Sequence, residues 1–212
     1  MARVTEALRN RIVTAKLAPG THLHQAEIAK EYGVSRIPIR DALQTLAGEG
    51  LVDLKPGGAT VSLMSAGDLD ELYELRGMIE PKTTALGVLA LGRLEIRQMR
   101  DLHLHMMETK DPLLWLDANV RFHRTIYARS GRPRSINLIE LLRSQTDRYL
   151  HLHLTVIDDG QHLHAEHEAI LEAVEARDGA AVEELTRRHL QSSHDFILEY
   201  LINSAVPAEA TV

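Results

Sequence analysis

The pattern of apolar and polar positions divides the chain into a mixed first third and a helical remainder. In the first third, Val4, Leu8 and Ile12 recur at every fourth position, the spacing that buries one face of a helix. Two β-rich runs flank the turn sequence of residues 55–59, which is typical of a hairpin. The expected order is a helix over 4–14, a short strand over 21–23, helices over 25–32 and 35–48, and strands over 51–54 and 60–63.

The chain after residue 65 shows helical spacing without a convincing strand, and its breaks contain glycine, proline or aspartate. Long helices joined by short loops are expected to pack as an antiparallel bundle. Helices are expected over 66–91, 94–109, 112–130, 134–155, 161–177 and 179–202. The fold is thus expected to be mainly α, with an N-terminal winged helix-turn-helix and a C-terminal antiparallel α-helical bundle of about six helices.

Charge and histidine content differ between these two parts. Residues 1–64 carry 8 Lys/Arg and 6 Asp/Glu, a net charge of +2, whereas residues 65–212 carry 16 and 24, a net charge of −8. Of the 12 histidines, 10 follow residue 100. We therefore expect two domains with different functions, over 1–64 and 65–204, followed by a frayed tail over 205–212.

Composition also indicates the cellular compartment in which the protein is expected. The chain has no cysteine, which excludes disulfides and thiolate metal sites and fits a reducing environment. No apolar segment reaches the length of a membrane span, and the N-terminus lacks the apolar region of a signal peptide. We therefore expect a cytoplasmic protein with no membrane partner.

The third expected helix carries two arginines at its start. Arg36 and Arg40 lie four residues apart and share one face just after Ser35, a residue type that favours helix starts. Apolar residues occupy the opposite face, namely Ile39, Leu43 and Leu46. Such a helix start suits insertion into the major groove of double-stranded DNA, where arginine reaches guanine or phosphate. The alternative is ordinary surface charge, paired with Glu27 or Asp41.

These motifs resemble the GntR family of transcriptional regulators, in the FadR-like subgroup with an all-helical, FCD-type ligand-binding domain. In the first part the resemblance rests on residues 17–21, 26–29, 33–43 and 49–52. In the helical part it rests on residues 68–76 with Glu80, residues 122–124, residues 166–170, and His189 with Leu190. A bundle of six helices without a further leading one is closer to the VanR-like branch of the subgroup.

The resemblance implies an effector-responsive regulator, often a repressor. It implies DNA contacts at Ser35, Arg36 and Arg40, and at Gly57 in the wing, where a bare backbone can approach the minor groove. Ala26 stands where family members often carry a basic residue, so one contact is missing here. One winged domain offers few base contacts, and we therefore expect a homodimer bound to a palindromic operator.

A group of histidines suggests a metal site in the helical part. Asn119 and His123 lie four residues apart and share a helix face, while His167 and His189 belong to the last two expected helices. The resemblance implies a divalent metal, Zn or Ni, held by an Asp-x-x-x-His pair and two further histidines. Asn119 replaces the usual aspartate and brings no charge, so we expect weaker binding. The alternatives are a metal-free core of satisfied histidines and a rival site that pairs His164 with His167.

Arg76 and Arg148 are the candidates for effector binding, because their helices are expected to line the same cavity. A cation beside an arginine suits a small organic acid, such as a sugar acid, a dicarboxylate or an aromatic acid. The alternative is a structural role, for instance an ion pair between Arg76 and Glu80, which lie four residues apart.

Two other functions stay open at this point. A helical metal centre with an open position can activate water, which would make the chain a metal-dependent hydrolase or lyase with an accessory DNA-binding head. No nucleophile elbow, phosphate-binding loop or His-Glu-x-x-His motif supports that interpretation, so we expect no enzyme activity. A helical scaffold with a vestigial DNA-binding part is the third option, and the intact set of Ser35, Arg36 and Arg40 argues against it.

Overall fold

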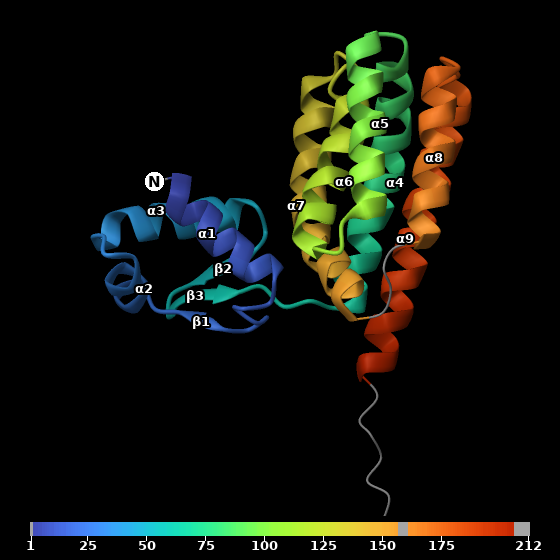
Figure 1. The fold of residues 1–212 in the computed structure, drawn as a ribbon. Coiled ribbons are helices and arrows are strands. Elements are labelled where there is room, and N and C mark those ends of the chain that lie inside the picture. Colours follow the sequence, from blue (N-terminus) through green and yellow to red (C-terminus); the bar gives the residue numbers. More distant parts are fainter. Residues whose placement is uncertain (1, 157–160, 206–212) are drawn as a thin grey trace, which may run out of the picture.

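The computed structural model describes residues 2–156 and 161–205. It consists of a small N-terminal head and a long helical bundle, which one extended segment joins between β3 and α4 (Figure 1). The mainly helical architecture and its division into a winged head and a bundle are as expected. The frayed tail expected over 205–212 lies, from residue 206 onward, outside the described residues.

The head is a helix-turn-helix with a three-stranded antiparallel sheet of order β1-β3-β2. Its wing is tighter than expected, because Lys55 pairs directly with Gly58 across a turn of two residues. Strand pairing can begin at Gly58 because this residue adopts a φ of +132°, a backbone conformation that residues other than glycine rarely adopt. The elements are α1 (Ala2–Val13), β1 (His22–Leu23), α2 (Gln25–Tyr32), α3 (Arg36–Gly48), β2 (Val52–Lys55) and β3 (Gly58–Val61).

Apolar side chains from every element of the head form its core. On α3, the side chains of Ile39 and Leu46 are fully buried, and they pack in one cluster with Leu8 of α1 and Ile28 of α2. Arg9 of α1 also donates two hydrogen bonds to the carboxylate of Glu49, at 2.9 and 2.6 Å, just beyond the end of α3. These contacts hold α3 with one face against the core and the other toward solvent.

The bundle contains six long helices within the described residues. Two of them, ending at Val88 and Tyr127, are three residues shorter than expected. After each end the chain forms tight turns in which amides bond to the carbonyl three residues earlier, and these turns keep a spacing of apolar residues that resembles a helix in the sequence. Ser65 caps the first helix as expected, since its hydroxyl accepts a hydrogen bond from the Asp68 amide at 3.0 Å. The helices are α4 (Ala66–Val88), α5 (Arg93–Glu108), α6 (Pro112–Tyr127), α7 (Pro133–Val156), α8 (Gln161–Glu175) and α9 (Gly179–Ala205).

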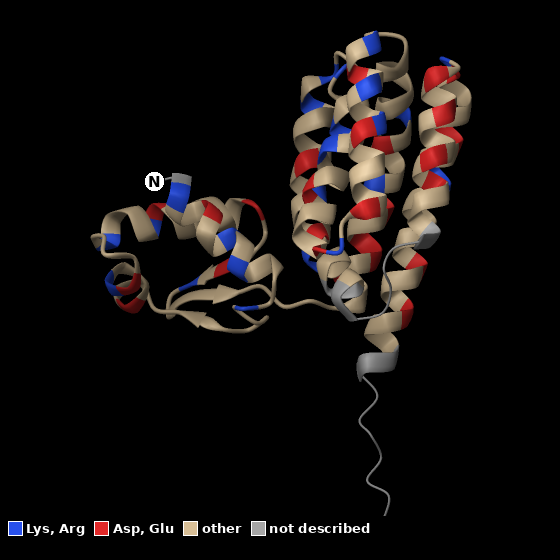
Figure 2. Ribbon diagram, in the orientation of Figure 1, with Lys and Arg blue, Asp and Glu red and all other residues tan. Residues whose placement is uncertain are grey.

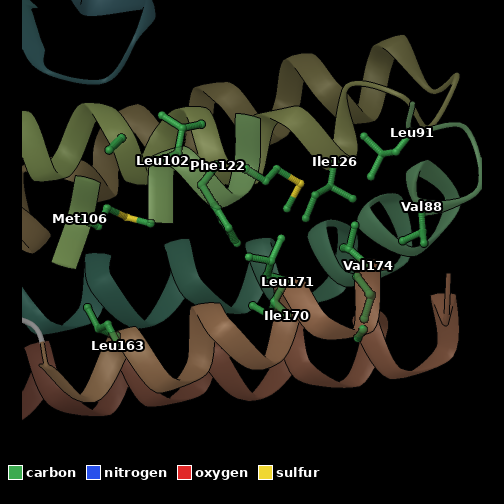
Figure 3. Close-up of a cluster of buried hydrophobic side chains, with 14 of the residues drawn as sticks. Val88, Leu91, Leu102, Met106, Phe122, Ile126, Leu163, Ile170, Leu171 and Val174 are labelled. Carbon is green, nitrogen blue, oxygen red and sulfur yellow. The ribbon is translucent and has the colours of Figure 1, made fainter. Parts of the chain in front are cut away.

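The main core of the bundle lies between α5, α6, α8 and the end of α4. Phe122, Ile126 and Ile170 are fully buried there, as Figure 3 shows. The long helix α4 packs against α6, α7 and α9 and so runs through the centre of the bundle. Figure 2 shows acidic positions repeated along α8, in keeping with the negative net charge of this part.

Candidate functional site

The turn between α2 and α3 sets the start of α3. Gly33 ends α2 with a φ of +64°, and its amide donates back to the carbonyl of Lys30. Ser35 occupies the N-cap position of α3 with extended backbone, but its side chain makes no capping hydrogen bond. The hydroxyl of Ser35 is therefore available to an outside acceptor such as a phosphate, together with the free amides of the first helical turn.

Arg36 and Arg40 project from the solvent face of α3. The side chain of Arg40 is 62% exposed, and its nearest acidic contact is Asp41 at 3.8 Å, a long distance for an exposed pair. Arg36 is exposed as well, and no acidic residue in the described part of the chain pairs with it. Gln44 is exposed one turn beyond Arg40, and the sequence analysis did not single it out. Two exposed arginines thus stand at the start of the second helix of a helix-turn-helix, and of these Arg40 has only a long contact with Asp41.

Gly57 lies in the two-residue turn at the tip of the wing. A Cβ built on Gly57 would meet nothing within 4 Å, so the backbone there is open to a large partner. The wing and α3 belong to the same head and share its core. The four residues expected to contact DNA therefore lie on two exposed features of the head.

Four of the expected ligands converge inside the bundle. The Nε2 atoms of His123 and His167 lie 3.1 Å apart, and Asn119 Oδ1 lies 3.0 Å from His167 Nε2. The ligand atoms of His123, His167 and His189 all fall within 4.8 Å of one another, and all three side chains are buried. The rival ligand His164 is outside this group, and its ring instead meets His103 edge-on at 6.5 Å.

The donor set of this cluster fits a divalent metal. Two ligand atoms about 2.0–2.1 Å from zinc are about 2.8–3.4 Å apart for bond angles between square and tetrahedral, and the two distances around His167 Nε2 fall in this range. Glu166 holds Nδ1 of His189 at 2.7 Å, the carboxylate contact that orients a metal-bound imidazole. Burial first, and then the charge of Arg143, lower the pKa of His123 well below its usual value. Burial, followed by the neighbouring His189, lowers the pKa of His167 in the same direction. Both rings are thus neutral at pH 7, as ligands must be.

A buried ion network lies beside the histidines, and Arg76 belongs to it. Arg76 Nε donates to Glu80 at 3.0 Å, and its Nη1 donates to the hydroxyl of Thr146 at 3.1 Å. Arg143 of α7 donates to the other oxygen of Glu80 at 2.7 Å. Burial acts to raise the pKa of Glu80, but the two guanidinium groups outweigh it and leave the pKa lowered. The ion pair between Arg76 and Glu80 that the spacing allowed is therefore present.

Arg143 is a site residue that the sequence analysis missed. It is 4% exposed, and after burial its charge is the largest cause that lowers the pKa of His123. The signal was a basic residue inside the apolar stripe of α7, since the neighbouring Leu142 and Thr146 are also buried. Two arginines of this network thus share hydrogen bonds with one glutamate.

Several hydrogen-bond donors in the bundle interior lack an acceptor. Arg143 Nε, the Tyr127 hydroxyl, the Thr186 hydroxyl and Trp115 Nε1 are buried without a partner among the described residues. Burial raises the pKa of Tyr127 to about 12, so its hydroxyl remains a donor at neutral pH. Buried donors of this kind are costly unless a ligand or water accepts from them.

Asp147 gives the network a testable pH dependence. Burial raises the pKa of this carboxyl to about 6, although Arg143 and Arg76 act to lower it. The folded protein therefore holds a poorly solvated charge above pH 6. We expect Asp147→Asn to raise the free energy of unfolding by about 1–2 kcal/mol at pH 7.5, and by about half as much at pH 5, where the folded state has already taken up the proton.

Urea denaturation at the two pH values measures this effect, with the exposed Asp101→Asn as the matched control. A variant that is less stable than the wild type at pH 7.5 would contradict the assigned environment of Asp147.

Arg148 does not line the cavity where it was expected. Its guanidinium donates to the backbone carbonyls of Ser62 and Leu63, both at 2.8 Å, in the segment that leaves the head. Its neighbour Tyr149 also receives a hydrogen bond from the Ser65 amide at 3.2 Å. Arg148 lies five residues after Arg143, about 140° around the helix, and so faces the head and not the ion network.

The comparisons with known proteins agree with this architecture. Residues 1–61 match the family described as bacterial regulatory proteins, gntR family, and residues 71–192 match the FCD domain. The first match covers the winged head, and the second covers the bundle from α4 to α9. No helix in the described part of the chain is long and apolar enough to cross a membrane.

Individual relatives span nearly the whole chain. It is 29% identical to the HTH-type transcriptional repressor RspR of Escherichia coli over 196 residues, covering 89% of this chain and 85% of the relative. It is 27% identical to the gluconate operon transcriptional repressor of Bacillus licheniformis, covering 83% of this chain and 76% of the relative. The solved structure of McbR/YncC from Escherichia coli shares the fold, with a TM-score of 0.83 at 23% identity over 94% of this chain and 97% of that one. The expected family is thus confirmed: the chain belongs to the gntR family of DNA-binding transcription regulators, with an FCD domain.

Proposed function

We propose that this regulator represses transcription by binding a palindromic operator as a homodimer, under the control of a small organic acid. The observation that carries the proposal is the pair of exposed cations, Arg36 and Arg40, at the start of α3. Arginine at this position of a helix-turn-helix reaches guanine bidentately or clamps phosphate. Ser35 and Gly57 supply further contacts, the first to phosphate and the second in the minor groove.

The dimer follows from the small size of the head. A single winged domain buries too little surface to select one site in a genome, whereas two copies on a two-fold symmetric operator multiply their contacts. The acidic bundle repels DNA and is the natural place for the two copies to meet. We assign DNA binding to residues 1–64 and dimerisation with effector binding to residues 65–204.

We further propose that Asn119, His123, His167 and His189 hold a divalent ion, with Zn and Ni as the candidates. The support is the convergence of four buried donors, with a carboxylate behind His189. When bound, the ion supplies a Lewis acid to which a carboxylate can coordinate. An amide oxygen contributes less to binding than a carboxylate, so the site is weaker than one with aspartate at position 119.

The effector is proposed to bind between the histidines and the buried arginines. Arg76 and Arg143 both donate to Glu80, and Arg143 Nε and the Tyr127 hydroxyl have no acceptor among the described residues. A small carboxylate offers the acceptor oxygens that these donors lack, together with a charge that suits the arginines. Arg148 is not part of this proposal, since backbone carbonyls at the edge of the head already occupy its guanidinium.

Helix α7 provides the physical link between the effector and the head. Arg143 lies on its inner face in the ion network, and Arg148 lies five residues further on and binds the segment that leaves the head. A ligand that binds the guanidinium of Arg143 can shift α7 and thereby change the hydrogen bonds of Arg148 to the segment that leaves the head. Such a ligand controls DNA binding only if its affinity differs between the two placements of the head.

The alternative of a metal-dependent hydrolase or lyase needs a general base beside the ion. Among the described residues, the two carboxylates bonded to site residues are already engaged, Glu166 with His189 and Glu80 with two arginines. The relatives are also regulators by name, and we therefore propose a control function without catalysis.

The metal site is tested by the elemental content of the purified protein. We expect about one divalent ion per chain after equilibration with Zn or Ni, and loss of most of it in His123→Ala, because three ligands bind far more weakly than four. Asn119→Asp should tighten binding about tenfold or more by restoring a charged ligand. The exposed His105→Ala serves as the control. An unchanged ion content in His123→Ala would rule out this ligand set.

A further inference from the structure

The start of α3 carries an apolar side chain that the fold does not use. Ile37 is 63% exposed, whereas its neighbour Ile39 is fully buried in the head core. Ile37 stands between Arg36 and Arg40 along the chain and makes no part of the hydrophobic core cluster of the head. Replacing it by a polar residue would therefore cost little stability, and its side chain is accessible to a partner that reaches the start of α3.

Helix geometry places Ile37 on the same face as the two arginines. With about 100° between successive residues, Ile37 lies about 100° around the helix from Arg36 and about 60° from Arg40. The exposed Gln44 falls between Ile37 and Arg40 in this projection. Arg36 and Arg40 are about 6 Å apart along the axis, which is less than two base-pair steps. A duplex that reaches both arginines therefore also meets Ile37.

The major groove offers one apolar partner to such a side chain. Bases display hydrogen-bonding groups along its floor, and only thymine adds a methyl group, on C5. Ile37 can neither donate nor accept a hydrogen bond, so its favourable position is against that methyl, with the arginines on neighbouring guanines or phosphates. Over a cytosine or a purine it would instead cover polar groups without satisfying them.

We propose that Ile37 is a specificity-determining residue that packs on the C5 methyl of a thymine in each half of the operator. The inference rests on the proposed DNA contacts of Arg36 and Arg40 and adds a prediction about the operator itself. Each half-site contains a thymine next to the base pairs that the arginines reach. Burying one methyl is worth about fourfold in affinity, and the symmetric pair about fifteenfold.

The test uses the full-length protein and a duplex selected by it from a random pool. Each symmetric pair of thymines is replaced in turn by deoxyuridine, which removes only the C5 methyl. For the wild type we expect a loss of about fifteenfold at one symmetric pair and small changes at the others. Ile37→Ala should bind the thymine and deoxyuridine duplexes equally at that pair. Leu89→Ala, which truncates an apolar side chain that is 78% exposed beyond the end of α4, should keep the wild-type preference.

The outcomes separate this inference from the proposed function. If Arg36→Ala loses binding but the wild type shows no difference between thymine and deoxyuridine at any pair, the role of Ile37 is refuted and the DNA contacts of α3 stand. If Ile37→Ala keeps the wild-type difference, the methyl is sensed elsewhere and the inference is also refuted. If the wild type selects no duplex at all, the proposed function and the inference fail together.

Discussion

Replacing Arg36 by alanine is expected to weaken operator binding at least about thirtyfold, and replacing Arg40 to do the same. Each bidentate contact of an arginine with a base is worth about 1–3 kcal/mol, and a two-fold symmetric dimer loses two such contacts at once. Both side chains are exposed, so their removal should leave the folded head intact. Fluorescence anisotropy with a labelled duplex at several salt concentrations measures the loss.

A conservative variant distinguishes the two ways in which each arginine can act. Lysine keeps the charge but not the fork of donors, so Arg36→Lys should restore binding if the side chain clamps phosphate and fail to do so if it reads guanine. Arg93→Ala removes the same charge at the exposed start of α5 and is the matched control. If neither Arg36→Ala nor Arg40→Ala weakens binding more than Arg93→Ala does, α3 is not the reading helix.

The second large effect is expected inside the bundle, where Glu80→Gln should lower the free energy of unfolding by about 3–5 kcal/mol. The substitution removes the one carboxylate that forms ion pairs with the buried guanidinium groups of both Arg76 and Arg143. Because the pKa of Glu80 is lowered in the folded state, its contribution is present at neutral pH and is lost as the pH falls through that lowered pKa. The difference between variant and wild type should therefore shrink in acid. Urea denaturation measures both.

Glu74→Gln, an exposed change on the same helix, should cost less than about 0.5 kcal/mol. A Glu80→Gln variant that is no less stable than this control would contradict the network. Replacing Arg76, Glu80 and Arg143 together by apolar residues of similar size should recover much of the stability. That triple variant should also lose its response to carboxylates, since the network is proposed to serve the effector.

Most of the head could be predicted from the sequence, because its signals are local. The spacing of Ile39, Leu43 and Leu46 fixed which face of α3 is buried, and Gly33 marked the turn before it. The wing was less exact, since the tight turn depends on the backbone conformation of Gly58, which composition does not reveal. The exposure of Ile37 could not be predicted either, because an isoleucine in an apolar-rich helix is more often buried.

The bundle interior was harder to predict, because its contacts join helices that are far apart in the sequence. Spacing alone identified the ion pair of Arg76 with Glu80, four residues apart on one helix. The second partner, Arg143, lies 63 residues away and emerged only from the packing of α7 against α4. The same packing turned Arg148 toward the head. Which helical face meets which neighbour is a tertiary property, and it decides the role of each buried arginine.

The most direct test is to recover the genomic fragments that the full-length protein binds and to compare them with those bound by the double variant Arg36→Ala, Arg40→Ala. The wild type should enrich a small set of fragments upstream of genes, each containing a palindrome with its two halves about one helical turn apart. The double variant should enrich none of them. An equal enrichment by the two proteins, or wild-type fragments with no shared palindrome, would contradict a dimeric regulator that reads its operator through α3.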